Sequence, residues 1–505
     1  MKGIQANNKR IAKNTAFLYL RMFLVLVVSL YTSRVVLNTL GVSDFGVYSV
    51  VGGFVSLFGF LNSTLSSSMS RFYNYEGGCR GEEGIKDVYT SGFWIHVILA
   101  VVIFIMLETF GLWYINNIMV IPQGRLFAAN VLFQYSVFSM SFVILQIPYT
   151  SVIMSYERMD FYALVSIIDV FLKLIIVIAL PYLPFDKLIT YATLTLIVAI
   201  ANFLFYYIYA KREFETIKLN KHVNKLLFKS FLSFSGWNLI GTFTYMLKGQ
   251  GVNMILNVFF GTIINAARGV AYQINNALSG FSQNISTAFR PQIVDSYSKN
   301  NQERVIKMLM SESKVCYFLI LVMIIPVILE IDYILKLWLG DAIPEYANIF
   351  SVLVLIDMLI CSLNAPVTQV TFATGNIKKY QIANSSLNIL LLPICWLFLV
   401  NGFESYTVFI ITIVFSIINQ IVCLACMKSV FPFRIKNYIN NVVYPLFALT
   451  IMLPIIPFVI RVNFVPSFIR LVFITITEGL LALILGWFVI LNKEEKKLVK
   501  EFVHK

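Results

Sequence analysis

Four basic side chains lie inside long apolar stretches of this sequence, where a charge is costly: Arg21, Arg34, Lys173 and Lys248. A Lys or Arg near the centre of a membrane helix costs about 2.5 to 3.5 kcal/mol, so such residues normally face a bundle interior or an aqueous cavity. The sequence contains no phosphate-binding loop, no nucleophile elbow and no carboxylate pair at hydrolase spacing. The chemistry that the four charges indicate is therefore the binding of an anion rather than catalysis.

Each of these charges also has a simpler interpretation. The side chain of Arg21 could reach the cytoplasmic headgroups from its apolar segment, and that of Arg34 could reach the opposite interface. Lys173 follows Asp169 by four residues, a spacing that places both on one helical face as an ion pair. Lys248 has no acid in its own segment. It is therefore the strongest candidate for contact with a substrate.

Polar side chains extend this pattern as stripes with helical spacing. Gln250, Asn253 and Asn257 recur at i, i+3 and i+7, and a second ridge begins at Arg268. Such groups either hold helices together, at about 0.6 kcal/mol per contact, or line a wet cavity. We favour the cavity for these two stripes. The predicted substrate-binding residues are Arg21, Arg34, Asn62, Lys248, Gln250, Asn253, Asn257, Arg268, Tyr272, Asn275 and Gln283.

The sign of the predicted cavity indicates its cargo. Cations and amide donors attract a phosphate, pyrophosphate or acidic sugar, because a positive charge in a low-dielectric wall is poorly screened. Three acids within apolar segments, Asp169, Asp357 and Glu478, are candidates for a proton or sodium relay. The three histidines and six scattered cysteines do not form a metal-binding pattern, and we expect no cofactor.

The elements that must position these residues are membrane-spanning helices. Of the 505 residues, 59% are hydrophobic and only 13% are charged, with a mean hydropathy of +0.80. Because one crossing needs roughly 20 apolar residues, the chain has room for about fourteen crossings, with about twelve as the alternative. The expected spans are residues 14–38, 46–70, 90–114, 126–150, 161–181, 188–209, 231–258, 266–289, 314–334, 347–372, 382–400, 406–427, 442–460 and 467–491.

Lys and Arg gather in alternate connections between these spans, which predicts that both termini are cytoplasmic. The same topology explains the net charge of +14, so nucleic acid is not an expected partner. A basic stretch suggests a division into a first lobe over residues 1–210, a linker over 211–230, a second lobe over 231–427 and a C-terminal part over 428–505.

A faint internal repeat supports two related lobes. Leu37 and Asn38 precede Gly41, and the same pair of residue types recurs as Leu256 and Asn257 before Gly261. Transporters are often built from such repeats, with the substrate path between them.

Several short motifs resemble the Wzx-type polysaccharide flippases of the multidrug/oligosaccharidyl-lipid/polysaccharide (MOP) exporter superfamily. These motifs are Arg-Ile-Ala-Lys-Asn-Thr at 10–15, Leu-Gly-Val-Ser-Asp-Phe-Gly-Val-Tyr at 40–48, Ser-Arg-Phe at 70–72, Ala-Arg-Gly-Val-Ala-Tyr-Gln at 267–273 and Phe-Arg-Pro at 289–291.

The resemblance implies an all-α polytopic membrane protein with two six-helix lobes in a V and two further C-terminal helices. It also implies a flippase that carries an undecaprenyl-pyrophosphate-linked oligosaccharide, an O-antigen or capsule repeat unit, across the bacterial inner membrane by alternating access. Arg34, Lys248 and Arg268 are similar in position to the basic cavity residues of such flippases. Membrane lipid, glycosyltransferases and a polysaccharide polymerase are the partners that follow.

Two alternatives remain. A multidrug antiporter for organic cations would keep the fold and change the cargo, but its cavity should carry acids and exposed aromatic residues. A membrane glycan polymerase or ligase would be an enzyme, and the very short loops on the outer face argue against it.

Overall fold

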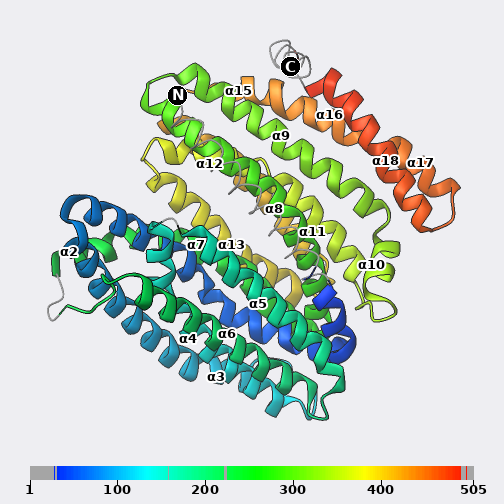
Figure 1. Ribbon diagram of the computed structural model, residues 1–505. Coiled ribbons are helices and arrows are strands. Elements are labelled where there is room, and N and C mark those ends of the chain that lie inside the picture. The colour runs from blue at the N-terminus through cyan, green and yellow to red at the C-terminus, as the bar shows by residue number, and fades with distance from the viewer. Residues whose placement is uncertain (1–27, 29–30, 157, 221–224, 491–495, 497–505) are drawn as a thin grey trace. The chain divides into compact units, whose positions relative to one another are not determined.

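The computed structural model describes residues 28, 31–156, 158–220, 225–490 and 496. Arg21 lies outside these residues, and the side chain of Asn62 is likewise not described. The described residues are helical throughout apart from turns and short connections, with no strand among them, and long helices run side by side (Figure 1). They form two compact units, one up to Ala266 and the other from Ala267 onward.

The first unit contains helical residues 31–56, which turn at Gly41, and the elements from η1 to α7. They are η1 (Leu57–Gly59), α2 (Phe60–Met106), η2 (Leu107–Gly111), α3 (Leu112–Asn117), α4 (Leu126–Ser155), α5 (Met159–Ala179), η3 (Leu180–Tyr182), α6 (Lys187–Glu213) and α7 (Lys225–Phe260).

The second unit contains most of α8 and all later elements. They are α8 (Thr262–Ser298), α9 (Gln302–Leu329), α10 (Ile331–Leu339), α11 (Ala347–Cys361), α12 (Asn364–Ala373), α13 (Lys378–Val400), α14 (Thr407–Val430), α15 (Ile435–Tyr438), η4 (Ile439–Val443), α16 (Tyr444–Met452), α17 (Ile455–Asn463), α18 (Phe468–Leu485) and η5 (Gly486–Ile490).

Eleven helices among the described residues are long and apolar enough to cross a membrane, so the chain is a multi-pass membrane protein. The predicted all-α fold is confirmed, while the count of fourteen is approached rather than reached. The first expected span lies largely outside the described residues. The helices α7 and α8 are long enough but are not among the eleven; α8 in particular carries many polar side chains.

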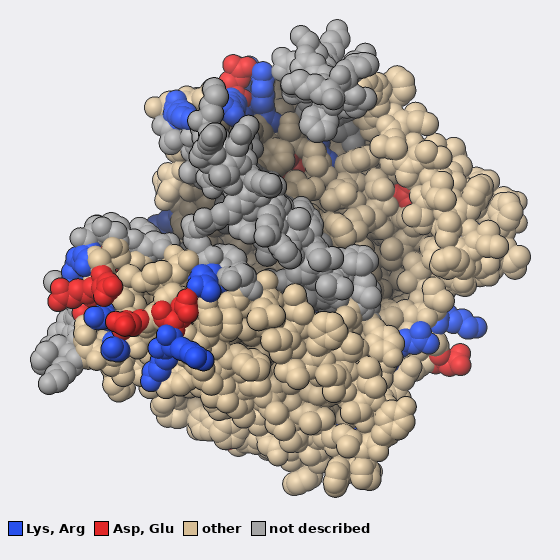
Figure 2. Space-filling model, in the orientation of Figure 1, with Lys and Arg blue, Asp and Glu red and all other residues tan. Residues whose placement is uncertain are grey.

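The surface matches a hydrocarbon environment. Helix α18, for example, exposes Phe468, Ile469, Phe473 and Leu480. On the face shown in Figure 2, charged side chains gather at a few places and leave broad areas without either sign. Apolar side chains in these areas can meet lipid at no desolvation cost.

Two expected boundaries are wrong. The segment between the spans at 46–70 and 90–114 is mostly helical rather than a loop, and two helical parts of α2 meet within it at Gly81, whose φ of 62° and ψ of −141° are not helical. Glycine adopts this conformation readily, so a single residue makes the turn. Helix α9 begins at Gln302, twelve residues before the expected start at 314, because its first turns are amphipathic rather than wholly apolar.

The glycines of the two similar sequence motifs have similar backbone conformations. Gly41 and Gly261 both have a φ of +76° and both separate consecutive helical segments. At Gly46, a Cβ atom would overlap the backbone carbonyl of Thr262, so the helical segment after Gly41 approaches the start of α8 closely. Glycine at these positions permits both the sharp turn and the tight packing.

Arg125 links three segments of the first unit. Its Nε donates to Asp44 Oδ1 at 2.8 Å, and its Nη1 lies 2.5 Å from Asp186 Oδ2. Asp186 also caps α6 by accepting from the backbone N–H groups of Leu188 and Ile189. Hydrogen bonding from Arg125 lowers the pKa of the Asp186 carboxyl below its ordinary value. The carboxylate is therefore ionised at neutral pH and caps the N-terminal end of α6.

In the second unit, a buried ion pair links separate helices. Arg470 of α18 lies 2.5 Å from Glu330, which follows α9 and has a fully buried side chain. Arg470 Nη1 also donates to the backbone carbonyls of Arg461 and Phe464 at the end of α17. The pair therefore ties the C-terminal helices to α9.

We predict that Glu330→Ala lowers the free energy of unfolding by about 3–5 kcal/mol, because it leaves the Arg470 charge buried without its carboxylate. The double variant Glu330→Met/Arg470→Met should recover much of this loss. Thermal unfolding of the purified protein, followed by tryptophan fluorescence, measures the effect. Glu303→Ala is the control, since Glu303 and Lys307 form an exposed pair and its loss should change little. Equal midpoints for Glu330→Ala and the wild type would contradict the assignment.

Candidate functional site

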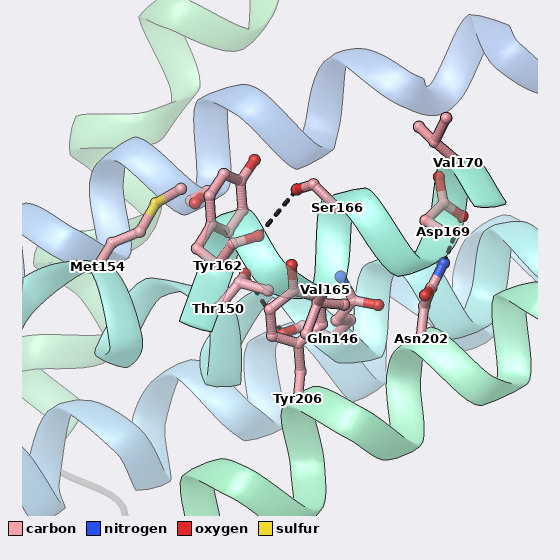
Figure 3. Close-up of a pocket in the computed structure, with 11 residues that line it drawn as sticks. Gln146, Thr150, Met154, Tyr162, Val165, Ser166, Asp169, Val170, Asn202 and Tyr206 are labelled. Carbon is pink, nitrogen blue, oxygen red and sulfur yellow. Dashed lines mark hydrogen bonds between the residues drawn. The ribbon is translucent and has the colours of Figure 1, made fainter. Parts of the chain in front are cut away.

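A polar cavity of about 270 Å³ lies among the helices of the first unit. Its walls come from α4, α5 and α6, with Ser66 of α2 at one side. Figure 3 shows the labelled side chains converging on this space. The polar lining includes Gln146, Thr150, Tyr162, Ser166, Asp169 and Asn202.

Asp169 is the charged acceptor of this cavity. Its Oδ2 lies 2.8 Å from Lys173 Nζ, one helical turn away, and its Oδ1 accepts from Asn202 Nδ2 at 2.7 Å. The predicted pairing on one helical face is therefore present. Lys173 is 52% exposed and Asp169 is 22% exposed, so the pair lies at the surface of the helices rather than in their core.

Several side chains that line the cavity with Asp169 also carry oxygen atoms. The amide oxygen of Asn202 is buried and has no hydrogen-bond partner in the described part of the chain. Ser166 donates its hydroxyl proton to the Tyr162 carbonyl at 2.9 Å, which leaves its oxygen lone pairs available (Figure 3). Carboxylate, amide and hydroxyl oxygens are the ligands that hard cations prefer, and a carboxylate can also take a proton.

The amide stripe of α7 forms a hydrogen-bonded network. Asn253 and Asn257 are 1% and 0% exposed. Asn253 donates to the Ser49 carbonyl at 3.2 Å, and Asn257 bonds the N–H and the carbonyl of Val120 and also Asn265. Asn265 in turn donates to Asn253 at 2.8 Å. These contacts hold together three parts of the first unit and use most of the hydrogen-bonding capacity of Asn253 and Asn257.

Gln250 continues this stripe beside Gly53, where a Cβ atom would collide with the Gln250 side chain. Its side-chain oxygen is buried and has no hydrogen-bond partner among the described residues. Lys248, half a turn earlier, is half-buried. Arg34, among the helical residues 31–56, is exposed.

Among the predicted cations that the structure describes, Arg268 is the most deeply buried. It is 6% exposed, and its guanidinium carbon lies 4.1 Å from the centre of the Tyr272 ring. Stacking on the ring holds the guanidinium by one face and directs its N–H groups sideways in one plane. Asn275 is half-buried and Gln283 is exposed further along α8.

The other two predicted ion-relay acids lie on separate helices of the second unit. Asp357 of α11 is half-buried, with Cys361 Sγ 3.9 Å from its Oδ2. Glu478 of α18 has no exposed surface, and both of its carboxyl oxygens lack a hydrogen-bond partner among the described residues. The structure therefore does not gather the three acids into one cluster.

A buried polar cluster of the second unit is absent from the sequence prediction. Gln369 of α12 donates to Glu312 Oε1 at 3.0 Å and to the Ser286 carbonyl at 2.9 Å. Glu312 is completely buried. It was missed because the sequence placed it in a loop, although its spacing from the apolar Leu309 and Cys316 follows one helical face.

No family model matches this sequence, and no curated protein matches it. Solved structures do. The lipid II flippase MurJ, in an inward closed conformation, aligns with a TM-score of 0.71 and 14% identity over 94% of this chain and 98% of its own. An inward-facing multidrug resistance MATE family transporter of the MOP superfamily aligns with a TM-score of 0.58 and 14% identity, over 84% of this chain and 95% of its own. An outward-facing multidrug resistance MATE family transporter of the MOP superfamily aligns with a TM-score of 0.58 and 16% identity, over 83% of this chain and 95% of its own.

The chain has the MOP fold. This confirms the fold expected from the sequence. The proteins that share it here are a flippase and transporters rather than enzymes, as the lack of a catalytic motif suggests. At 14–16% identity the likeness concerns the fold and not the cargo.

We predict that the cavity around Asp169 is open to water. In a background with all six native cysteines replaced, Ser166→Cys should react rapidly with a small charged methanethiosulfonate reagent. Val177→Cys, on the same helix at a site that is 1% exposed, should react at least about tenfold more slowly. Mass spectrometry of the labelled protein measures both rates. Equal protection of the two cysteines would show that the cavity is closed.

Proposed function

We propose that this protein is a flippase that moves an undecaprenyl-pyrophosphate-linked oligosaccharide from the cytoplasmic to the periplasmic leaflet of the bacterial inner membrane by alternating access. The observation that carries the proposal is the likeness to the lipid II flippase MurJ over 94% of the chain. We infer that the cargo is an O-antigen or capsule repeat unit, made by glycosyltransferases and passed to a polymerase.

The extent of the likeness favours a lipid-linked cargo over a drug. The MATE transporters align with 83–84% of the chain, so the MurJ likeness covers about a tenth more of it and has the higher TM-score. The charge of the predicted contacts agrees, because Lys248 and Arg268 are cationic and suit an anionic headgroup.

Arg268 is the residue that we assign first to the pyrophosphate. A guanidinium that is stacked on Tyr272 keeps a fixed plane and can offer two parallel N–H groups to phosphate oxygens. Arg34 and Lys248 add charge, and Gln250, Tyr272, Asn275 and Gln283 offer polar contacts to sugar. The roles of Arg21 and Asn62, which lie outside the described side chains, stay predictions.

The cavity of the first unit suits a coupling site. Asp169 can take a proton or a sodium ion when Lys173 moves away, and Asn202 supplies a neighbouring amide oxygen. We therefore place ion coupling at Asp169 before Asp357 or Glu478, because Asp169 alone of the three lines this cavity.

The assignment of Arg268 predicts a loss of transport in cells. Arg268→Ala together with Lys248→Ala should lower surface polysaccharide at least about tenfold, because two charge-assisted contacts to the pyrophosphate are removed. The undecaprenyl-linked repeat unit should accumulate inside the cell, as measured by extraction and chromatography. Arg268→Lys should retain only part of the activity, since Lys lacks the planar fork.

Lys428→Ala, an exposed lysine at the end of α14, is the matched control and should behave as the wild type. Immunoblots must show equal amounts of each variant in the membrane. Normal surface polysaccharide in the double variant would refute the headgroup role. Raised drug susceptibility with normal polysaccharide in a deletion strain would instead favour the multidrug antiporter.

The coupling role predicts a specific defect in proteoliposomes. Asp169→Asn should make the transport rate independent of imposed pH and sodium gradients, because the amide can neither ionise nor bind a cation with full charge. Glu108→Gln is the control, since Glu108 is another acid within a helix of the same unit and bonds Gln134 at 2.9 Å. Retention of the gradient response by Asp169→Asn would exclude Asp169 as the coupling residue.

A further inference from the structure

A second hollow in the first unit is a long apolar groove of about 840 Å³. It runs between the second half of α2, α4 and α6, and the chain after α6 closes one end. Phe93, Val97, Leu145 and Phe203 contribute to its walls. Val101 and Leu204, which also line it, are 52% and 42% exposed, so the groove opens to the outside of the unit.

The groove has a basic end. Lys211 and Lys218 line it there, and no acid is found among its described lining residues. Lys211 Nζ donates to the Tyr207 hydroxyl at 2.7 Å and lies 4.7 Å from the centre of the Tyr207 ring. The ring holds the ammonium group beside the groove and leaves further N–H bonds for another acceptor.

Two acids near this end, Asp87 and Glu213, already have partners. Asp87 lies 2.7 Å from Arg80 Nη2, and Glu213 lies 2.7 Å from Arg158 Nη1. In the described part of the chain neither Lys211 nor Lys218 forms an ion pair with a carboxylate. Their charges are therefore available to an external anion.

The chain that carries Lys218 is fixed in place. Asn220 donates its backbone N–H to Thr90 Oγ1 at 2.9 Å and its side-chain amide to Asp87 Oδ1 at 2.8 Å. Ile217 is buried at 3% exposure. The basic end is thus formed before any ligand arrives, which reduces the entropy cost of binding.

The length of the groove fits one leaflet. Tyr89 and Val101, at its two ends along α2, are twelve residues apart, or about 18 Å at 1.5 Å per residue. Half of a hydrocarbon layer of about 30 Å is about 15 Å. A lipid chain that starts at the basic end can therefore lie along the groove within its own leaflet.

We propose that this groove binds one anionic phospholipid of the membrane, with its phosphate between Lys211 and Lys218 and one acyl chain along Phe93, Val97 and Phe203. The charge complementarity of the basic end and the apolar length behind it together select this ligand. The site is separate from the cavity around Asp169, and it does not depend on which cargo the protein carries.

The test measures lipid binding to the purified, delipidated full-length protein by native mass spectrometry. Phosphatidylglycerol should bind at least about tenfold more tightly than phosphatidylcholine. Each lysine near a membrane surface changes the affinity for an anionic lipid about fivefold, so Lys211→Gln/Lys218→Gln should abolish most of this preference. Lys378→Gln/Lys379→Gln, two exposed lysines at the start of α13, should leave it unchanged.

A second variant tests the apolar part. Val97→Trp fills the groove and should weaken binding of both phospholipids while the lysines remain. Equal affinities of the wild type for the two lipids, or an unchanged preference in the Lys211/Lys218 variant, would overturn the proposal. Displacement of phosphatidylglycerol by millimolar inorganic phosphate would reveal a simple anion site. Preferential binding of undecaprenyl phosphate would instead assign the groove to the cargo. Both experiments measure lipid binding and not transport, so failure of the proposed flippase function would leave their results unchanged.

Discussion

Polar groups that enter the hydrocarbon layer must find partners inside the protein, because neither lipid nor a dry core can replace water. The packing of both units follows from this constraint. In the first unit, Asn253, Asn257 and Asn265 bond one another and the backbone at Ser49 and Val120. In the second, the pair of Arg470 and Glu330 joins the C-terminal helices to α9. Apolar side chains alone would leave these helices free to slide, since lipid satisfies them equally well.

Much of the fold could be predicted from the sequence because hydropathy and charge bias are local signals. The apolar runs placed most helices to within several residues, and the recurrence of Leu-Asn before glycine marked the matching turns at Gly41 and Gly261. The two wrong helix boundaries lie where a helix extends beyond the hydrocarbon layer. Residues 71–89 and 302–313 are polar, yet they are helical apart from the break at Gly81. Polarity indicates exposure to water and does not by itself end a helix.

The site was harder to predict because a hydrogen-bond partner is a tertiary property. Helical spacing correctly paired Asp169 with Lys173, one turn apart. It could not pair Asp169 with Asn202 or Asn257 with Val120, which are 33 and 137 residues apart along the chain. The sequence therefore identifies polar stripes, while the structure shows whether a stripe bonds neighbouring helices, as Asn253 and Asn257 do, or borders a cavity, as Asp169 does.

The acids within the membrane-spanning helices differ in whether they border a cavity or are enclosed by neighbouring helices. A carboxylate that exchanges a cation during transport needs access to water and partners that it can release. Asp169 lines a cavity and is 22% exposed, and its lysine partner is 52% exposed. Glu478 has no exposed surface, and Glu312 is completely buried against Gln369. An ion that arrives from water can reach neither Glu478 nor Glu312 unless the helices around them move apart, whereas Asp169 already borders a cavity. The structure therefore separates an acid that a small ligand can approach from acids that helix packing encloses.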